Sequence, residues 1–221
     1  LREKWDLLHA HSRVPFWIAW WTASLARIPW IATAHALYSK NAGIYPLRKA
    51  NGAICVSKAV ENHLEKFLPL RSRIIYNGLF SRQELEALKE SCWQGPHNLR
   101  EKRLLFVGRL TKIKGLQVAL EALEGLPQEK YSWMLDVLGE GPLEEEFLRI
   151  VERQGWQNRV FFHGYRNDVT EWMKRSSCLL FPSLQEGMGR VFLEALALKM
   201  PILASRLPAL EELVDAEDLV P

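Results

Sequence analysis

The chain has 221 residues, which is enough for one large domain or two small ones. Hydrophobic residues make up 48% of it and charged residues 25%, as in ordinary soluble globular proteins. The formal net charge is only +3, with acidic and basic residues interspersed, which argues against nucleic acid as a partner because a nucleic-acid-binding protein carries a concentrated basic face.

The cysteines and the apolar segments indicate where the protein works. Three widely spaced cysteines, none at metal-ligand spacing, predict reduced thiols in a cytosolic protein: Cys55, Cys92 and Cys178. No signal peptide is recognisable, and the most apolar segment, VPFWIAWWTASLARIPWIATAHALY, is a poor membrane span because Arg27 and Pro29 interrupt it. We expect a cytoplasmic protein. Since the chain starts at Leu1 and stops at Pro221 without a closing element, we also expect it to be a piece of something longer.

Short β-branched or Leu-rich runs alternate with helical patterns, which is typical of an α/β protein with parallel sheets. A first series of strands is predicted near residues 6–9, 30–33, 52–56 and 73–76, and a second near 104–108, 133–138, 159–163, 178–181 and 202–204. Apolar residues at three- and four-residue spacing predict helices in KAVENHLEKFL, GLQVALEALEGL, LEEEFLRIVERQG and RVFLEALAL. The polar segment KESCWQGPHNLREK separates the two series, so we predict domains over 1–95 and 96–221 with a cleft between them.

Ligands of doubly wound sheets bind at the carboxyl ends of the strands, and two cations follow the first strand of the second series. In VGRLTKIKG, Arg109 and Lys114 come just past the strand, and Gly115 starts a helix. Such a pair suits a diphosphate, with each charge-assisted contact worth about 1.5–3 kcal/mol. Taken alone, the pair slightly favours the alternative of two solvated loop cations. His163, in a later loop, is predicted to be a structural hydrogen-bonding partner.

The stretch EGMGRVFLEAL combines a loop, two glycines and a helix start, which suits an anionic ligand. Glu186 lies in the loop and can reach a ligand in the cleft. Glu194 lies about one turn into the helix and could accept hydrogen bonds from the two hydroxyls of a ribose. The alternative is that Glu194 compensates the helix dipole and Glu186 is a surface acid.

These motifs together resemble a known family. VGRLTKIKG, LGEGP, FHGYRNDV, FPSLQEGMGRVFLEALAL and MPILAS, in this order and spacing, resemble the nucleotide-sugar half of a family-4 retaining glycosyltransferase. WDLLHAHS, IPWIATAHALYS, CVSKAVENHL and IIYNGLF resemble its acceptor-side domain. The resemblance implies the glycosyltransferase B fold: two Rossmann-like, doubly wound parallel-sheet domains, here a partial acceptor-side domain and a donor-binding domain without its closing helix. A chain lacking those parts is expected to be inactive alone.

The resemblance also implies roles for single residues. Arg109 and Lys114 bind the donor diphosphate, and Glu194 holds the ribose. Glu186 contacts hydroxyls of the donor sugar, which His35 faces from the other domain. The catalytic set is therefore Glu186, His35, Arg109 and Lys114. Further donor-binding positions are the backbone amides of Gly187, Met188 and Gly189, the base-side residues Tyr165 and Arg166, and Gly139, Arg190 and Val191.

The implied reaction is metal-independent transfer with retention, from a UDP-, GDP- or ADP-sugar to a glycan, lipid-linked or small-molecule acceptor, as in polysaccharide or lipopolysaccharide biosynthesis. A catalytically silent nucleotide-sugar-binding module and a sugar-nucleotide epimerase are the alternatives. Peripheral membrane contact is conceivable through an aromatic face flanked by Arg13 and Arg27, although the apolar helix pattern favours burial. The aromatic residues concerned are Phe16, Trp17, Trp20 and Trp21.

Overall fold

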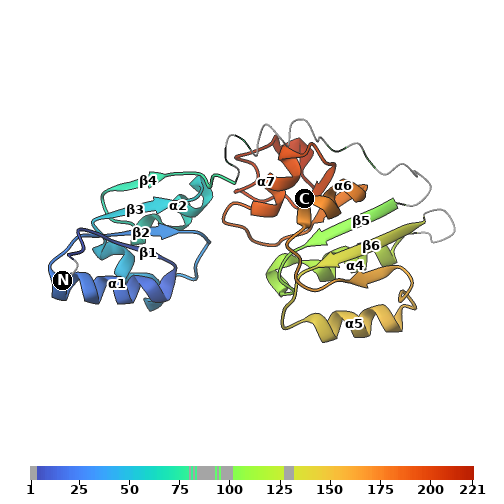
Figure 1. The fold of residues 1–221 in the computed structure, drawn as a ribbon, viewed down its shortest axis with the longest axis horizontal. Helices are drawn as coiled ribbons and strands as arrows, with labels where there is room; N and C mark the ends of the chain where they lie inside the picture. Colours follow the sequence, from blue (N-terminus) through green and yellow to red (C-terminus); the bar gives the residue numbers. More distant parts are fainter. Residues whose placement is uncertain are drawn as a thin grey trace. The chain divides into compact units, whose positions relative to one another are not determined.

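The computed structural model describes residues 4–79, 81, 83, 93, 95, 102–126 and 132–221 (Figure 1). The chain forms two compact units. The first unit comprises Leu1–Asn77 with two later segments, Glu186–Gly189 and Pro208–Val214, and the second comprises the remainder. The domain boundary predicted near residue 95 falls in a stretch of which few residues are described, so it stays a prediction.

The first unit is built on a four-stranded parallel sheet in the order β1-β2-β3-β4. Its elements, in chain order, are β1 (Leu8–His11), α1 (Arg13–Ala26), β2 (Trp30–Ala34), η1 (Ala42–Lys49), β3 (Gly52–Cys55), α2 (Lys58–Leu64), η2 (Glu65–Phe67) and β4 (Ser72–Ile74). The central strand β2 is almost entirely buried, as expected for a parallel strand covered on both faces. Strand β1 lies two residues later than predicted, because its register pairs Leu8 with Trp30. Both His9 and His11 therefore lie within the strand.

Helix α2 is capped from two sides, one of them remote in sequence. The Ser57 hydroxyl accepts a hydrogen bond from the Val60 N–H at 3.1 Å, as an N-cap residue does. The Glu212 carboxylate accepts from the backbone N–H groups of Lys58 and Ala59, at 2.8 and 2.6 Å. A negative charge at the positive end of a helix is favourable, so this carboxylate fastens the Pro208–Val214 segment to the first unit.

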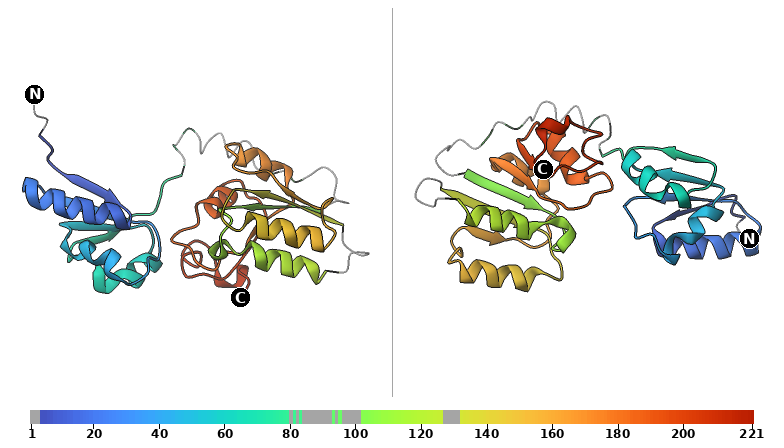
Figure 2. Two further views of the ribbon diagram at one scale, coloured as in Figure 1. Left: turned by 90° about the horizontal axis from the view of Figure 1, so that it is seen from below. Right: turned by 180° about the vertical axis from the view of Figure 1, so that it is seen from behind.

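The second unit is built on a five-stranded parallel sheet in the order β7-β6-β5-β8-β9. Its elements are β5 (Lys102–Val107), η3 (Lys112–Lys114), α4 (Leu116–Glu124), β6 (Trp133–Leu138), α5 (Glu144–Arg153), β7 (Val160–Phe162), α6 (Val169–Arg175), β8 (Cys178–Phe181), α7 (Arg190–Ala197), β9 (Ile202–Ala204) and η4 (Ala216–Asp218). Helices α4 and α5 lie side by side on one face of the sheet, while α6 and α7 lie on the other (Figures 1 and 2). The predicted α/β class, the nine strands and the four helices named from the sequence are confirmed.

Helix α1 is apolar on two opposite faces. Phe16, Ala19 and Ala23 are buried, whereas four residues spaced by three or four positions are exposed and form a row that we call the α1 stripe: Val14, Ile18, Trp21 and Leu25. The burial expected for the aromatic residues is right for Phe16 and wrong for Trp21, which is 63% exposed. The cause is that α1 packs on its sheet by one face only. In the described part of the chain, no helix is long and apolar enough to span a bilayer.

A buried polar network crosses the second sheet. Asp136 on β6 is 1% exposed, and its two carboxylate oxygens lie 3.0 Å from the Arg103 guanidinium and 2.7 Å from Nε2 of His163. The His163 ring in turn contacts the ring of Trp172 on α6 at 4.3 Å between centroids. This confirms His163 as a structural partner and fixes the start of the loop that follows β7.

Replacing the buried carboxylate by its isosteric amide tests this network. Asp136→Asn should lower the free energy of unfolding by about 2 kcal/mol, because Arg103 loses its charged partner in a low-dielectric environment. Urea unfolding followed by circular dichroism measures the change. The matched control is Glu171→Gln, which removes the exposed Glu171–Lys174 pair (3.0 Å) and should cost less than about 0.5 kcal/mol. Equal effects of the two variants would contradict a stabilising role for the buried pair.

Candidate functional site

A pocket of about 1150 Å³, lined by charged and apolar residues, opens at the carboxyl ends of the strands in the second unit. Parallel strands bring their carboxyl ends to one edge, so loops that are distant in sequence meet there. Strands β5, β6 and β7 each contribute the residues that follow them, and α7 contributes its first turns. Seven residues predicted from the sequence line this pocket: Arg109, Gly139, Tyr165, Arg166, Arg190, Val191 and Glu194.

The two predicted phosphate-binding cations lie along the turn after β5. Arg109 lines the pocket. Lys114 closes η3, and its aliphatic stem packs beside the pocket residue Gly108, 3.6 Å from where a β-carbon on that glycine would be. Gly115 holds this turn in place, because it has a φ of +71° and a β-carbon there would collide with the carbonyl of Pro182. Both cations are thus set on a turn whose backbone is packed against the end of β8.

Glu194 and Arg190 pair with each other at the start of α7. Arg190 is the first residue of the helix and Glu194 lies one turn further, as predicted. Their side chains form an ion pair, with Arg190 Nε 2.9 Å from Glu194 Oε1. Glu194 is largely buried, with 16% of its side chain exposed against 75% for Arg190. The charge of Arg190 is therefore balanced locally, and the pair presents a dipolar rather than a positive surface to the pocket.

The loop after β7 carries the two residues expected near a base. Arg166 donates two hydrogen bonds to Asp168, at 2.9 and 2.8 Å, and these lower the pKa of Asp168 to about 2. The Tyr165 ring is exposed, while its backbone N–H donates to the carboxylate of Glu140 at 3.2 Å. The charge of Arg166 is thus already compensated by Asp168, and its guanidinium lies over the Trp172 ring, 5.9 Å from the centroid.

Glu140 is a pocket residue that the sequence reasoning missed. Its carboxylate bonds the Tyr165 backbone, and its own carbonyl accepts from the N–H of Leu110 at 2.9 Å, so it ties the loops after β5, β6 and β7 together. Its position between two glycines directly after a strand, in LGEGP, was the available signal.

The segment Glu186–Gly189 belongs to the first unit by its contacts. The Ser57 hydroxyl donates to the Gly187 carbonyl at 2.5 Å, and the Asn77 N–H lies 3.2 Å from the sulfur of Met188. Gly187 packs so closely on His35 that a β-carbon would collide with the His35 carbonyl oxygen. Hence Glu186, Gly187, Met188 and Gly189 group with His35, rather than lining the pocket of the second unit.

Three histidines lie together at the carboxyl ends of β1 and β2. His9 Nε2 is 2.8 Å from the Thr33 hydroxyl, and His11 Nδ1 is 2.9 Å from Nε2 of His35. Burial lowers the pKa of both His9 and His35, and the neighbouring His11 lowers both further. Each of His9 and His11 thus makes a hydrogen bond to a side chain on or directly after the next strand, β2. The signal was the two-residue spacing of HAH and TAH, which puts alternate residues on one face of a strand.

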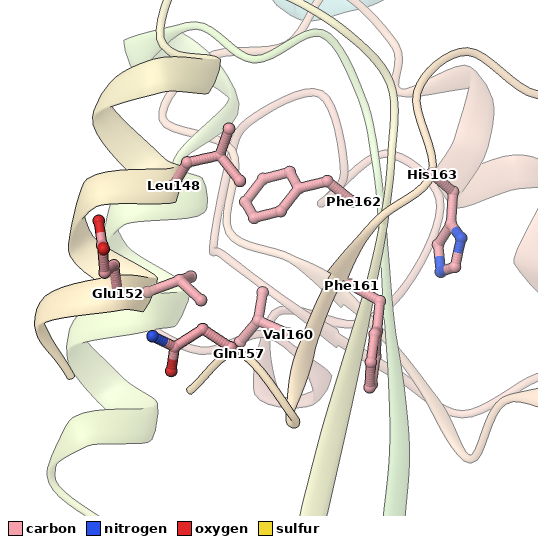
Figure 3. Close-up of a pocket in the computed structure, with 8 residues that line it drawn as sticks. Leu148, Glu152, Gln157, Val160, Phe161, Phe162 and His163 are labelled. Carbon is pink, nitrogen blue, oxygen red and sulfur yellow. The ribbon is translucent and has the colours of Figure 1, made fainter. Parts of the chain in front are cut away.

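A second hollow, of about 510 Å³, lies between α5 and β7. Figure 3 shows Leu148 and Phe162 facing one another across it, while Phe161 and His163 lie on the other side of the strand. None of the residues predicted for a functional site lines it. Within the described ranges, no group of three or more His, Cys, Asp or Glu side chains is arranged to hold a metal ion.

Two parallel α/β units, one with a pocket of paired cations and carboxylates at its strand ends, define a class of protein with the glycosyltransferase B fold. The chain belongs to the family "Glycosyl transferases group 1", whose pattern matches residues 89–219; residues 1–79 match "Glycosyltransferase Family 4". These matches confirm the family resemblance seen in the sequence.

Relatives and solved structures agree with this assignment. An uncharacterized glycosyltransferase of Methanocaldococcus jannaschii is 29% identical over 221 aligned residues, which cover 95% of this chain and 58% of the relative. The lipopolysaccharide glucosyltransferase WaaG of Escherichia coli is 32% identical over 143 residues, 62% of this chain and 38% of WaaG. HepE of Anabaena, solved in complex with UDP and glucose, superposes with a TM-score of 0.76 at 21% identity, over 96% of this chain and 62% of HepE. The chain thus spans less than two thirds of each of these proteins.

Proposed function

We propose that the protein is a retaining glycosyltransferase that moves a sugar from a nucleotide-sugar donor to a glycan, lipid-linked or small-molecule acceptor. The observation that carries this proposal is the pocket of the second unit, where Arg109 and Tyr165, from the loops after β5 and β7, converge with Glu194 of α7. A cation, a carboxylate and an exposed aromatic ring suit, in that order, the diphosphate, the ribose and the base of one nucleotide. Family membership supports the same reading.

In the proposed reaction, the bond between the sugar C1 and the diphosphate oxygen breaks as a bond forms between C1 and the acceptor oxygen on the same face. The acceptor hydroxyl gives its proton to the departing phosphate. Arg109 and Lys114 stabilise the charge that develops on the leaving group, a task that needs no metal. Glu186 and His35 orient the sugar through its hydroxyls.

UDP-glucose is the first donor to test, because HepE was solved with UDP and glucose and WaaG is named a glucosyltransferase. The name of WaaG also makes lipopolysaccharide biosynthesis the first pathway to test. The two alternatives predict different outcomes in the same assay. A silent module would bind the donor without turnover, whereas an epimerase would interconvert donor sugars.

Removing one cation at a time tests the diphosphate clamp. Arg109→Ala and Lys114→Ala should each weaken UDP binding by about 10- to 100-fold, the equivalent of one charge-assisted contact, and should leave uridine binding unchanged. Titration calorimetry with both ligands measures this. Lys112→Ala is the matched control, since this cation is on the same turn but, unlike the stem of Lys114, is not among the nearest neighbours of the pocket residue Gly108. Equal losses in all three variants would show that only the general charge of the turn matters.

Product stereochemistry tests retention. With an α-linked nucleotide-sugar donor, proton NMR of the product of the complete enzyme should show an α-glycoside from the first turnover. A β-glycoside, or a covalent glycosyl-enzyme trapped on Glu186, would overturn the same-face mechanism.

We further propose that the protein works at the cytoplasmic face of a membrane, with the α1 stripe in the interface. Residues 7–60 contain no Asp or Glu but six Lys or Arg, which suits an anionic lipid surface.

In a sedimentation assay with phosphatidylglycerol vesicles, the protein should be recovered in the vesicle pellet, and Trp21→Ala should reduce the bound fraction severalfold. Leu148→Ala, which alters an exposed apolar residue of α5 in the second unit, is the control. If the unaltered protein does not bind the vesicles, the proposed membrane location is wrong.

A further inference from the structure

The cluster of His9, His11 and His35 shows an arrangement that the proposed function leaves unexplained. The His11 ring lies between the other two, with centroids 4.1 Å from His9 and 5.2 Å from His35. The planes of the His11 and His35 rings differ by only 21°, and the two rings meet edge to edge through a hydrogen bond, with Nδ1 of His11 2.9 Å from Nε2 of His35. His9 is anchored on the other side by the Thr33 hydroxyl. The orientation of the His35 ring is therefore set through His11.

The shared hydrogen bond also restricts the protons on both rings. Two ring nitrogens 2.9 Å apart can hold only one proton between them, because one nitrogen must donate and the other accept. A neutral imidazole carries a single N–H. If Nε2 of neutral His35 is protonated, its other nitrogen, Nδ1, carries no proton, and if Nε2 is not protonated, Nδ1 is. Neutral histidine in water favours the proton on Nε2. Both rings keep this preference only when His35 Nε2–H donates to His11 Nδ1, which leaves His35 Nδ1 as an acceptor.

The surroundings of His35 favour the neutral form of its ring. His9 and His11 face His35 from β1, and the Tyr38 hydroxyl lies 3.4 Å from the His35 backbone N–H. Further groups around Tyr38 are the Arg13 guanidinium, 5.8 Å from the centre of its ring, and His63 Nε2, 2.7 Å from its carbonyl. The segment Glu186–Gly189, which packs on the His35 carbonyl through Gly187, brings one carboxylate, that of Glu186. Burial, then His11 and His9, lower the pKa of His35, in keeping with a neutral ring at pH 7.

We infer that His11 is a positioning residue that holds His35 as a neutral imidazole with its proton on Nε2, so that the bare Nδ1 of His35 accepts a hydrogen bond from a hydroxyl of the substrate. The arrangement of the two rings stands on the structure of the first unit alone. The role toward the substrate rests on the proposed function.

The arrangement can be tested without any substrate. In the chain labelled with ¹⁵N-histidine, long-range ¹H–¹⁵N correlation spectra report which nitrogen of each ring is protonated, and His35→Gln assigns the His35 signals. In the unaltered chain, His35 should show a protonated Nε2 and a bare Nδ1, with a protonation midpoint below the ordinary value for histidine. A proton on Nδ1 of His35 would overturn the inference.

Two variants of His11 separate the hydrogen bond from ring packing. His11→Phe keeps a ring but removes the acceptor, so His35 should show both tautomers. His11→Asn places an amide oxygen close to the lost Nδ1 and should restore the single tautomer. In both variants the midpoint of His35 should rise, because the neighbouring charge of His11, which lowers it, is gone. His63→Phe, which lacks contact with the His35 ring, is the control and should leave the tautomer unchanged. A single tautomer retained in His11→Phe would contradict the inference, and if that variant does not fold, the unaltered chain and His11→Asn still decide.

Kinetics of the complete enzyme then test the role in transfer. His11→Phe should lower kcat about tenfold with little change in the KM for the donor, and His11→Asn should recover most of the loss. Unchanged kcat in His11→Phe, beside the expected spectra, would overturn the catalytic part alone. Absence of transfer in the unaltered enzyme would instead count against the proposed function, and the tautomer of His35 would still be decided by NMR.

Discussion

Both sheets are entirely parallel, and the remainder of the structure depends on this constraint. In a parallel sheet every strand delivers the residues that follow it to the same edge, whatever their distance along the chain. In the second unit, this edge gathers the residues after β5, β6 and β7 around one pocket. In the first unit, the corresponding edge holds the histidine cluster, formed from the ends of β1 and β2. Each candidate site is therefore a consequence of strand direction before any side chain is considered.

Two arginines of the pocket in the second unit are held by carboxylates within the protein. Arg190 pairs with Glu194, and Arg166 pairs with Asp168. Side chains that are already paired are also already oriented. A ligand can replace one member of such an ion pair with its own polar group, and the remaining side chain is then in position to bind it. Glu140 acts similarly on the backbone, because its carboxylate and carbonyl bond two different loops. Polar contacts between the loops thereby help to order the pocket.

The first unit is completed by two short segments from the C-terminal part of the sequence, Glu186–Gly189 and Pro208–Val214. Glu212 caps α2, and Tyr76 donates a hydrogen bond to the same carboxylate at 3.0 Å. Gly187 lies between the Ser57 hydroxyl and the His35 carbonyl, where only a residue without a β-carbon fits. The glycines of EGMGR therefore have a packing role of their own: at Gly187, the absence of a side chain lets two backbones approach.

The amino-acid sequence by itself determined the elements and the outline of the donor-side pocket. Hydrophobic periodicity is local, so the nine strands could be located from it, and strand-end motifs such as VGRLTKIKG and FHGYRNDV pointed to residues that line the pocket. Only the tertiary structure decided which polar groups pair: His11 with His35, Asp136 with Arg103 and His163. It also decided that Trp21 is exposed, because exposure depends on which face of α1 meets the sheet. Pairing and exposure depend on contacts between residues that are far apart along the chain. Hydrophobic periodicity and turn propensity, in contrast, depend only on residues that are close together in the sequence.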